Sequence, residues 1–310
     1  MATTYCYYTQ TTPTNNKKWT YSFWFKRGTL GVVQNLMSCW EDGNNHTIMR
    51  LNASDQLSVY DWANPTDYTL VTTRVFKDTG AWYHVTWVWD NANVTEGDRV
   101  ILYINGVRET VFGTETYPTT GWAPVMNTSG NVVEIGRRSD GGYFDGDMSH
   151  IQFVDGTACA PTDFGEFDST SGIWKIKTGA FATPGNNGFF LKMEDRTNLD
   201  LDSGTNAFTF TTSGDLTATY DNPSDNFCIW SRLNPQAYPW YMSNGNTTAQ
   251  TAVDSTWRSV FSTLGNDTGK YYFECELDDD GGAGSVGILA TEQQAPSNSQ
   301  FSDLSLGYAA

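Results

Sequence analysis

The sequence predicts an all-β protein in which two antiparallel sheets pack face to face. Three observations predict this class. Short runs alternate apolar and polar residues with a period of two, which is typical of a half-buried strand. Aromatic residues, which favour strands, are abundant, with 12 Trp, 16 Tyr and 17 Phe in 310 residues. Turn-forming residues interrupt the runs about every 8–12 residues, and no long amphipathic helical pattern occurs.

The predicted strands follow one another through the first half of the chain. They occupy residues 19–25, 56–60, 69–76, 82–89 and 99–104. In the run at 82–89, alternation places Val85, Trp87 and Trp89 on one face and His84 on the other. We expect Trp82 and Trp87 to lie in the core of the sandwich, because large rings bury much apolar area there.

A tight reversal is expected at Asn105 and Gly106, directly after the run at 99–104. Asn-Gly is the strongest short hairpin signal, because a type I′ turn requires a positive φ at both central residues. Helical structure is expected only as a brief turn near residues 161–164.

The charge balance excludes several classes of partner. The chain has 18 Lys and Arg against 35 Asp and Glu, which gives a net charge of −17. Nucleic-acid binding needs basic residues that displace counterions, and anionic lipid surfaces also attract basic segments. No apolar run approaches the ~20 residues of a membrane-spanning helix. We therefore expect no nucleic-acid partner and no membrane insertion.

The cysteines indicate a reducing compartment. The chain has five of them, at positions 6, 39, 159, 228 and 275. Their odd number, wide spacing and lack of a Cys-x-x-Cys pair predict neither a disulfide framework nor a structural zinc site. The N-terminus shows no basic stretch followed by an apolar core, so no secretory signal is indicated. We expect the protein to fold in the cytosol.

The composition changes after about residue 158. We assign residues 1–158 to the sandwich and residues 159–236, rich in Gly, Asn, Asp and Thr, to an irregular extension packed on it. Strand-like runs at 257–261 and 270–276 predict a second β-domain over residues 237–310. That domain is only partial, because a full sandwich takes roughly 100 residues.

Three motifs in the first region carry a family resemblance. They are Gly-Ala-Trp-Tyr-His-Val-Thr at 80–86, Leu-Tyr-Ile-Asn-Gly-Val at 102–107 and Ile-Gly-Arg at 135–137. Their order and spacing over residues 15–158 resemble a laminin-G-like, concanavalin-A-like jelly roll. The resemblance implies an antiparallel jelly-roll sandwich, often with calcium bound at its rim.

Further motifs resemble an extended jelly-roll module in virion proteins of tailed phages. They are Gly-Tyr-Phe-Asp-Gly at 142–146, Phe-Val-Asp-Gly at 153–156, Phe-Gly-Glu-Phe-Asp at 164–168, Gly-Ile-Trp-Lys at 172–175, Gly-Phe-Phe-Leu-Lys at 188–192, Asp-Ser-Gly at 202–204 and Asp-Asn-Pro-Ser-Asp-Asn-Phe at 221–227. Residues 255–260 and 269–274 are similar to the start of a SPRY-type sandwich. The implied whole is a phage virion protein made in the host cytoplasm. Tail fibres and spikes are usually homotrimers. The resemblance therefore also implies an oligomer, such as a trimer, that contacts other virion proteins.

Candidate sugar-binding residues are aromatic rings next to turn residues, with arginines nearby in sequence. Rings stack on the apolar faces of pyranoses, while polar side chains bind the hydroxyl groups. We expect these residues on loops, because loops on rigid sandwiches commonly carry binding sites. The candidates are Trp40, Trp62, Trp122, Arg137 and Tyr143. The alternative is that these rings belong to the core.

Calcium is the candidate metal ion, because hard oxygen ligands lie in two predicted turns. The candidate ligands are Asp42, Asn44 and Asp145. The alternative is that Asp and Asn serve there only as turn formers.

Catalysis has one candidate, the carboxylates Glu274 and Glu276 on a predicted strand. A spacing of two places them on one face, as a pair of glycosidase carboxylates requires. The alternative is a solvent-facing strand that leads into an acidic turn. The histidines lack any local nucleophile motif. We therefore expect no enzyme.

Four functions remain open at this stage. The first is a tail fibre or spike that binds carbohydrate on the host surface, and the second is a capsid decoration or head-fibre protein without a glycan role. The third is a polysaccharide-degrading enzyme that uses Glu274 and Glu276. The fourth is a protein-binding adaptor that acts through the SPRY-like part. We favour the first.

Overall fold

The chain divides into two compact units, residues 1–227 and residues 228–310. The structure is a computed structural model that describes residues 3–63, 66–233, 241–250, 259–266, 268–277 and 286–288.

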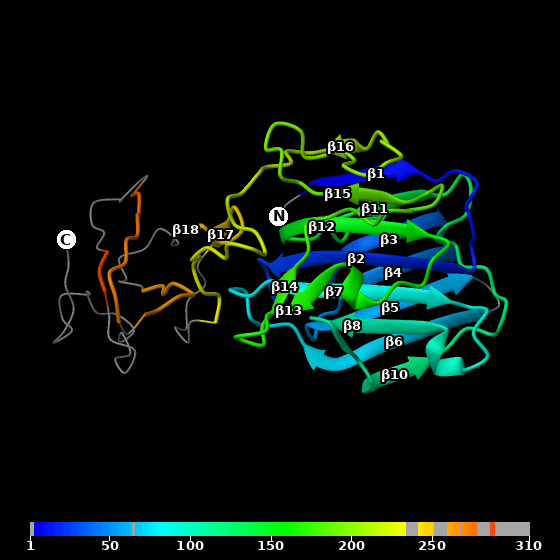
Figure 1. Cartoon of the computed structure of the whole chain (residues 1–310). Coiled ribbons are helices and arrows are strands. Elements are labelled where there is room, and N and C mark those ends of the chain that lie inside the picture. The colour runs from blue at the N-terminus through cyan, green and yellow to red at the C-terminus, as the bar shows by residue number, and fades with distance from the viewer. Residues whose placement is uncertain are drawn as a thin grey trace. The chain divides into compact units, whose positions relative to one another are not determined.

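The first unit is a sandwich of two antiparallel sheets, shown as two layers in Figure 1. The eight-stranded sheet has the order β10 (Phe112–Thr116), β6 (Thr66–Val75), β5 (Gln56–Ala63), β4 (Asn45–Leu51), β3 (Gln34–Asp42), β11 (Val132–Ile135), β1 (Tyr5–Thr9) and β16 (Thr211–Ser213). The six-stranded sheet has the order β15 (Phe189–Leu191), β12 (Gly146–Asp155), β2 (Lys18–Arg27), β7 (Tyr83–Asp90), β8 (Val100–Ile104) and β9 (Val107–Arg108). The predicted fold class, a jelly-roll sandwich, is therefore confirmed.

The core lies between the two sheets and is rich in indole rings. Val85, Trp87 and Trp89 alternate inward from β7 and are fully buried. Trp19 of β2 stacks parallel to Trp89 at 5.7 Å between ring centroids and meets Trp87 edge-on at 4.9 Å. Edge-on and offset arrangements are the favourable geometries for aromatic pairs. The prediction of Trp87 as a core residue is confirmed.

The prediction for Trp82 is wrong. Trp82 precedes β7 and lies outside the main core, in a separate cluster with Trp24 and Trp174. Successive side chains of a strand point to opposite faces, and here the core takes Val85, Trp87 and Trp89. Trp82 and His84 are therefore directed to the outer side of the six-stranded sheet, where the hairpin of β13 (Gly165–Phe167) and β14 (Trp174–Ile176) covers them.

The predicted reversal after β8 is confirmed. Asn105 has a φ of 49° and Gly106 a φ of 77°, the two positive values that a type I′ turn requires. A Cβ on Gly106 would lie 2.3 Å from the ring of Trp174. Glycine is therefore required both by the turn and by the indole packed on it.

Residues 159–227 carry short elements attached to the sandwich. The turn η2 (Pro161–Asp163) is the brief helical segment that the sequence predicts, and a similar turn, η1 (Glu96–Asp98), precedes β8. Beyond the β13–β14 hairpin, β15 and β16 extend one sheet each. Asp221 ties the end of this segment down, because its carboxylate accepts hydrogen bonds from the buried Lys26 ammonium (2.5 Å) and from Trp82 Nε1 (2.7 Å).

The second unit contains the two-stranded sheet of β17 (Tyr241–Ser243) and β18 (Thr248–Gln250). The strand predicted at 270–276 is wrong, because no strand occurs over residues 268–277. Tyr272 is 82% exposed there, so the aromatic side chains of this segment do not pack into a core among the described residues. Of the other predicted run, 257–261, residues 257 and 258 lie outside the described residues, and residues 259–261 form no strand.

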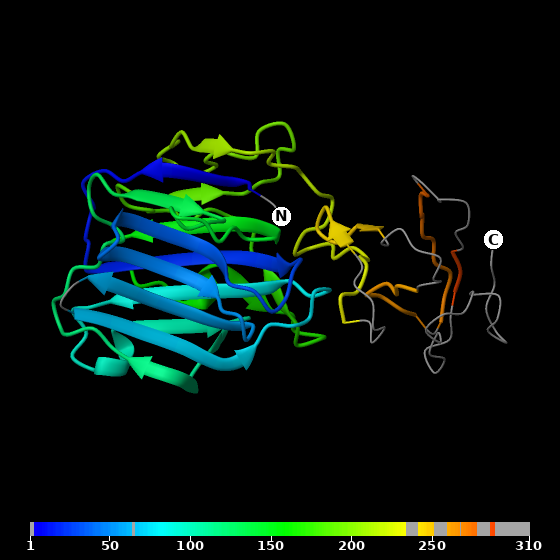
Figure 2. The same ribbon diagram turned by 180° about the vertical axis from the view of Figure 1, so that it is seen from behind.

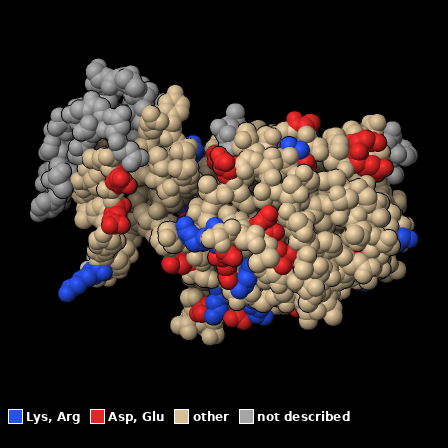
Figure 3. Space-filling model, turned by 90° about the horizontal axis from the view of Figure 1, so that it is seen from above, with Lys and Arg blue, Asp and Glu red and all other residues tan. Residues whose placement is uncertain are grey.

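Acidic groups outnumber basic ones on the visible surface in Figure 3, and most of that surface carries no charge. Among the described residues, no helix is long and apolar enough to cross a membrane.

Candidate functional site

The outer face of the eight-stranded sheet gathers most of the predicted sugar-binding residues, and Figure 2 views the molecule from this side. In β3 the inward positions Met37 and Cys39 belong to the core, so Trp40 points outward. The register then places Trp40 opposite His46 of β4, and His46 opposite Trp62 of β5. These three rings form one row across three neighbouring strands.

We call the outer surface of β1, β11, β3, β4 and β5 the aromatic face. It is made by Tyr5, Tyr7, Trp40, His46, Tyr60 and Trp62 with Arg137, Arg138, Asp140 and Tyr143 from the segment after β11. Trp40 and Trp62 thus lie on strands, which corrects the prediction that they are loop residues. β3 and β5 are each paired with a neighbouring strand on both sides, so the two tryptophans are held rigidly.

His46 joins the rings of the row. Its imidazole stacks on Trp40 with centroids 4.7 Å apart and planes 10° apart, and it meets Tyr60 edge-on at 5.9 Å. Burial lowers the pKa of His46, so the ring is held in its neutral form. Trp62, at the end of the row, remains 47% exposed, so that part of its indole is open to solvent.

Arg138 extends across this row from the segment after β11. Its guanidinium carbon lies 6.0 Å from the centroid of Trp40, and its side chain forms a bidentate ion pair with Asp140. This pairing lowers the pKa of Asp140, whose side chain is 52% exposed. The pair offers hydrogen-bond donors and acceptors beside the rings.

A second group of rings lies at the β1 end of the aromatic face. The Arg137 guanidinium carbon lies 3.7 Å from the centroid of Tyr5, and Tyr5 is adjacent to both Tyr7 (5.8 Å) and Tyr143 (6.2 Å). Arg137 also donates two hydrogen bonds to Glu134, at 3.0 and 2.6 Å. The arginine is therefore fixed in place by a ring below it and a carboxylate beside it.

Trp122 does not belong to the aromatic face. It is half-buried, and its carbonyl oxygen accepts a hydrogen bond from the Asn91 side chain, which directly follows β7 of the other sheet. Four of the five predicted sugar-binding residues therefore come together, and Trp122 stands apart. His46 and Tyr60 were missed, because only the strand register shows that they adjoin the predicted rings.

Two of the candidate calcium ligands, Asp42 and Asn44, share one turn, and the third, Asp145, lies elsewhere. Asp42 lies at the C-terminal end of β3, where its carboxylate accepts hydrogen bonds from the amide N–H of Asn44 (2.7 Å) and the side chain of Asn45 (3.1 Å). Asp145 lies by the opposite end of β3, bonded to Thr29 through its side chain and to Gly28 through its carbonyl oxygen. The turn contacts satisfy Asp42, as the turn-former alternative expects. In the described part of the chain, no group of three His, Cys, Asp or Glu side chains is arranged to hold a metal ion.

The candidate catalytic pair is not held on a strand. Glu274 and Glu276 are exposed and lie in the strand-free segment 270–277. The residue that would continue the acidic series, Asp278, lies outside the described residues. The enzyme hypothesis depends on two carboxylates on one face of a strand. The prediction that Glu274 and Glu276 are placed in this way is therefore wrong.

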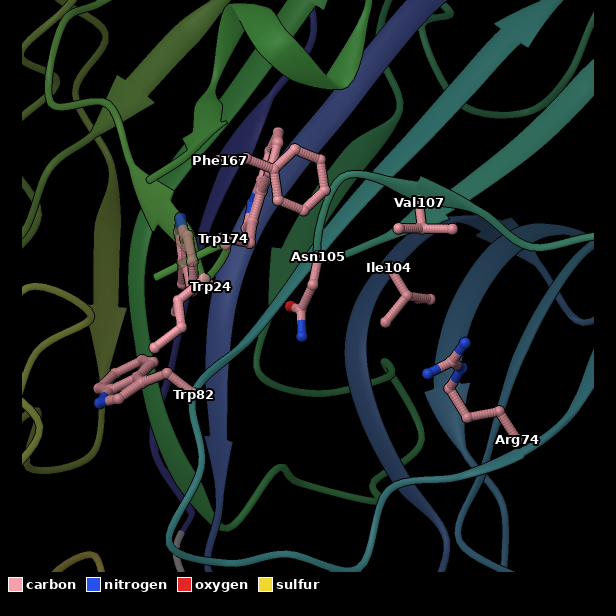
Figure 4. A pocket seen from close by; sticks show the side chains of 10 residues that line it. Trp24, Arg74, Trp82, Ile104, Asn105, Val107, Phe167 and Trp174 are labelled. Carbon is pink, nitrogen blue, oxygen red and sulfur yellow. The ribbon is translucent and has the colours of Figure 1, made fainter. Parts of the chain in front are cut away.

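A pocket of about 370 Å³ lies on the outer side of the six-stranded sheet, and the sequence did not predict it. Figure 4 shows Trp24, Trp82 and Trp174 on one side of it, with Phe167, Val107 and Arg74 around the remainder. The indole N–H of Trp174 donates to Nδ1 of His84 (3.1 Å), which leaves Nε2 as the donor to Ser22 Oγ (2.9 Å). Burial lowers the pKa of His84 to about 3, so this tautomer is neutral.

Comparison with curated proteins finds no match. Among solved structures, the chain is similar to a SAP-like pentraxin from Limulus polyphemus, at 20% identity over 52% of this chain and 73% of that chain with a TM-score of 0.35. It is also similar to domains LG4-5 of the mouse laminin alpha1 chain, at 7% identity over 50% and 40% of the two chains with a TM-score of 0.37. The CBM40 module of a Ruminococcus gnavus IT-sialidase, bound to sialyllactose, matches at 17% identity over 43% and 74% with a TM-score of 0.31.

The family comparison is decisive for the fold. Residues 2–160 match the family described as the concanavalin A-like lectin/glucanases superfamily, which confirms the laminin-G-like resemblance. The matched range includes every strand of the aromatic face. The chain belongs to the concanavalin A-like lectin/glucanase superfamily.

Proposed function

We propose that the protein binds carbohydrate through the aromatic face. The observation that carries this proposal is the row of Trp40, His46 and Trp62, which ends in a half-exposed indole beside the Arg138–Asp140 pair. Ring faces suit the apolar faces of sugars, and the paired guanidinium and carboxylate suit their hydroxyl groups. Membership of a superfamily that includes lectins agrees with this reading.

We propose binding without catalysis. The two acidic side chains of the aromatic face, Glu134 and Asp140, are each paired with an arginine. Glycoside hydrolysis needs one carboxyl group that is held protonated as a general acid, whereas the hydrogen bonds from Arg138 lower the pKa of Asp140 and favour its ionised form. Prolonged incubation with a bound polysaccharide should therefore release no reducing ends.

The biological setting that we propose is a phage virion, in a tail fibre or spike that contacts host-surface glycans. The motifs between residues 142 and 227 support this setting through their resemblance to tailed-phage proteins. Assembly as a trimer in the host cytoplasm, with other virion proteins as partners and a SPRY-like domain at 237–310, belongs to the same proposal.

A particle-surface protein without a glycan role is the second candidate. The rim of the pocket favours it, because Phe167, Ile173 and Val107 are 51%, 67% and 55% exposed, as in surfaces that meet another protein. Immunogold labelling of purified particles separates the two settings, since label on the tail supports the first and label over the head supports the second.

The binding proposal is tested by Trp62→Ala in affinity electrophoresis through gels that contain bacterial surface polysaccharides. We expect the variant to lose at least about tenfold in affinity, as central aromatic contacts commonly do. Tyr220→Ala is the matched control, because Tyr220 is 71% exposed and packs on Arg196, away from the aromatic face. Equal retardation of the wild type and of Trp62→Ala would contradict the proposal.

A further inference from the structure

The aromatic face has rings at both of its ends. In one register line, Tyr7 of β1 lies opposite Glu134 of β11, Glu134 opposite Ser38 of β3, Ser38 opposite Ile48 of β4, and Ile48 opposite Tyr60 of β5. Five adjacent strands define four spacings of about 4.8 Å, so the line is roughly 19 Å long. That length exceeds one sugar ring and suits a chain of several.

The strand residues in the middle of the line, Glu134, Ser38 and Ile48, are buried, and polar side chains from the segment after β11 lie next to them. Glu134 accepts hydrogen bonds from Ser38 Oγ (3.3 Å) and Ser139 Oγ (3.0 Å). Arg138 and Asp140 stand beside this stretch, next to Trp40. The polar groups that a ligand can reach between the tyrosine end and the tryptophan end are therefore those of Arg138, Ser139 and Asp140, and they suit a hydroxyl-rich ligand that crosses the strands.

Two arginines of this face have their charge compensated by carboxylates. Arg137 is paired with Glu134 and Arg138 with Asp140, so neither guanidinium is available to a second carboxylate at full strength. Arg50 lies 4.9 Å from the ring of Tyr60 and has no ion pair among the described residues. The whole chain carries a net charge of −17. This net charge opposes the binding of a polyanionic ligand.

We infer that the aromatic face binds an uncharged glycan chain in an extended form that crosses β5, β4, β3, β11 and β1. This inference rests on the proposed function. One sugar ring stacks at Trp62 and another at the cluster of Tyr5, Tyr7 and Tyr143, while the sugar rings between them bond to Arg138, Ser139 and Asp140. The site thus recognises the interior of a neutral polysaccharide rather than a single terminal sugar.

The length of the bound chain is tested by calorimetric titration with a size series. The probes are oligosaccharides of one to six units, prepared from a neutral polysaccharide that the wild-type protein retains in affinity electrophoresis. Affinity should rise at least about 100-fold along the series, because each added contact region contributes. Trp62→Ala and Tyr143→Ala should each weaken the longest probe about tenfold, and Tyr220→Ala should not.

Two results overturn this inference without touching the proposed function. One is an affinity that stays constant along the size series. The other is full affinity of the Tyr143→Ala variant while the separate Trp62→Ala variant has lost binding. Failure of the wild type to bind any saccharide is a different result, because it overturns the proposed function itself.

The charge of the ligand is tested with a matched pair of polymers, the neutral polysaccharide and its carboxymethylated derivative. The neutral polymer should bind at least about tenfold more tightly, and its affinity should change little with salt, because no net charge is neutralised on binding. Tighter binding of the carboxymethylated polymer, with a steep loss of affinity in salt, would overturn the assignment of an uncharged chain.

Discussion

At the scale of single residues, a buried carboxyl group anchors the long loop between β10 and β11. Asp61 points inward from β5 and is fully buried. Its Oδ2 accepts hydrogen bonds from Thr47 Oγ1 (2.8 Å) and from the amide N–H of Val125 (3.0 Å). Thr47 Oγ1 in turn accepts from the amide N–H of Met126 (2.9 Å). The loop is thereby fixed against the inner side of the eight-stranded sheet.

Asp61 makes the stability of the protein depend on pH. Burial raises its pKa to about 7, against an ordinary value of 3.8. A folded-state pKa above the unfolded value means that this contribution to stability is fully present below pH 4 and is lost as the pH rises through 7. Asp61→Asn should remove this dependence. The free energy of unfolding of the variant minus that of the wild type should therefore increase by about 2–4 kcal/mol from pH 4 to pH 8. Urea unfolding of both proteins across this range measures the change, and parallel curves would contradict it.

Gly106 illustrates a residue fixed by two constraints at once. Gly106→Ala would place a methyl group 2.3 Å from the Trp174 ring at a φ of 77°. The backbone strain alone costs about 1–3 kcal/mol, and the clash adds to it. Gly43→Ala is the control, because nothing lies within 4 Å of its Cβ position. We expect a clearly lower urea midpoint for the first variant and an unchanged one for the second, and equal midpoints would contradict this account.

At the scale of elements, the β13–β14 hairpin is held on the sandwich chiefly by one indole. Trp174 is 7% exposed, bonds to His84, and lies against Gly106 and Gly165. Trp174→Ala should cost about 3–5 kcal/mol of local packing. Limited proteolysis should then cleave within residues 160–185 first and leave the remaining sandwich intact. Trp174→Phe, which keeps a ring, is the control and should be cleaved more slowly, and identical digestion of Trp174→Ala and wild type would contradict this role.

The elements also show how much the sequence predicts. Period-two runs identify β2, β7 and β8, because there one face is buried and the pattern is strong. The run at 270–276 has the same pattern without a partner strand in the described residues, since pairing is not encoded locally. For the site, Trp40, Trp62, Arg137 and Tyr143 can be chosen by residue type. Their neighbours His46 and Tyr60 cannot, because these residues adjoin the rings only through the pairing of β3, β4 and β5.

At the scale of the whole molecule, the sandwich has two outer surfaces of different character. The eight-stranded sheet exposes the aromatic face with its two arginine–carboxylate pairs, and the six-stranded sheet is overlaid by the β13–β14 hairpin and its pocket. The first surface suits hydroxyl-rich ligands, whereas the apolar rim of the second suits contact with protein. One fold can therefore present a ligand surface and an assembly surface on opposite sheets.

Hydrogen–deuterium exchange, measured with and without a retained neutral polysaccharide, tests the central claim most directly. The account predicts slower exchange on binding in peptides that cover β3, β4 and β5 and the segment from β11 to Tyr143, with no change over the β13–β14 hairpin. Protection centred on residues 165–176 and on the turn at Asn105, with the aromatic face unchanged, would contradict it.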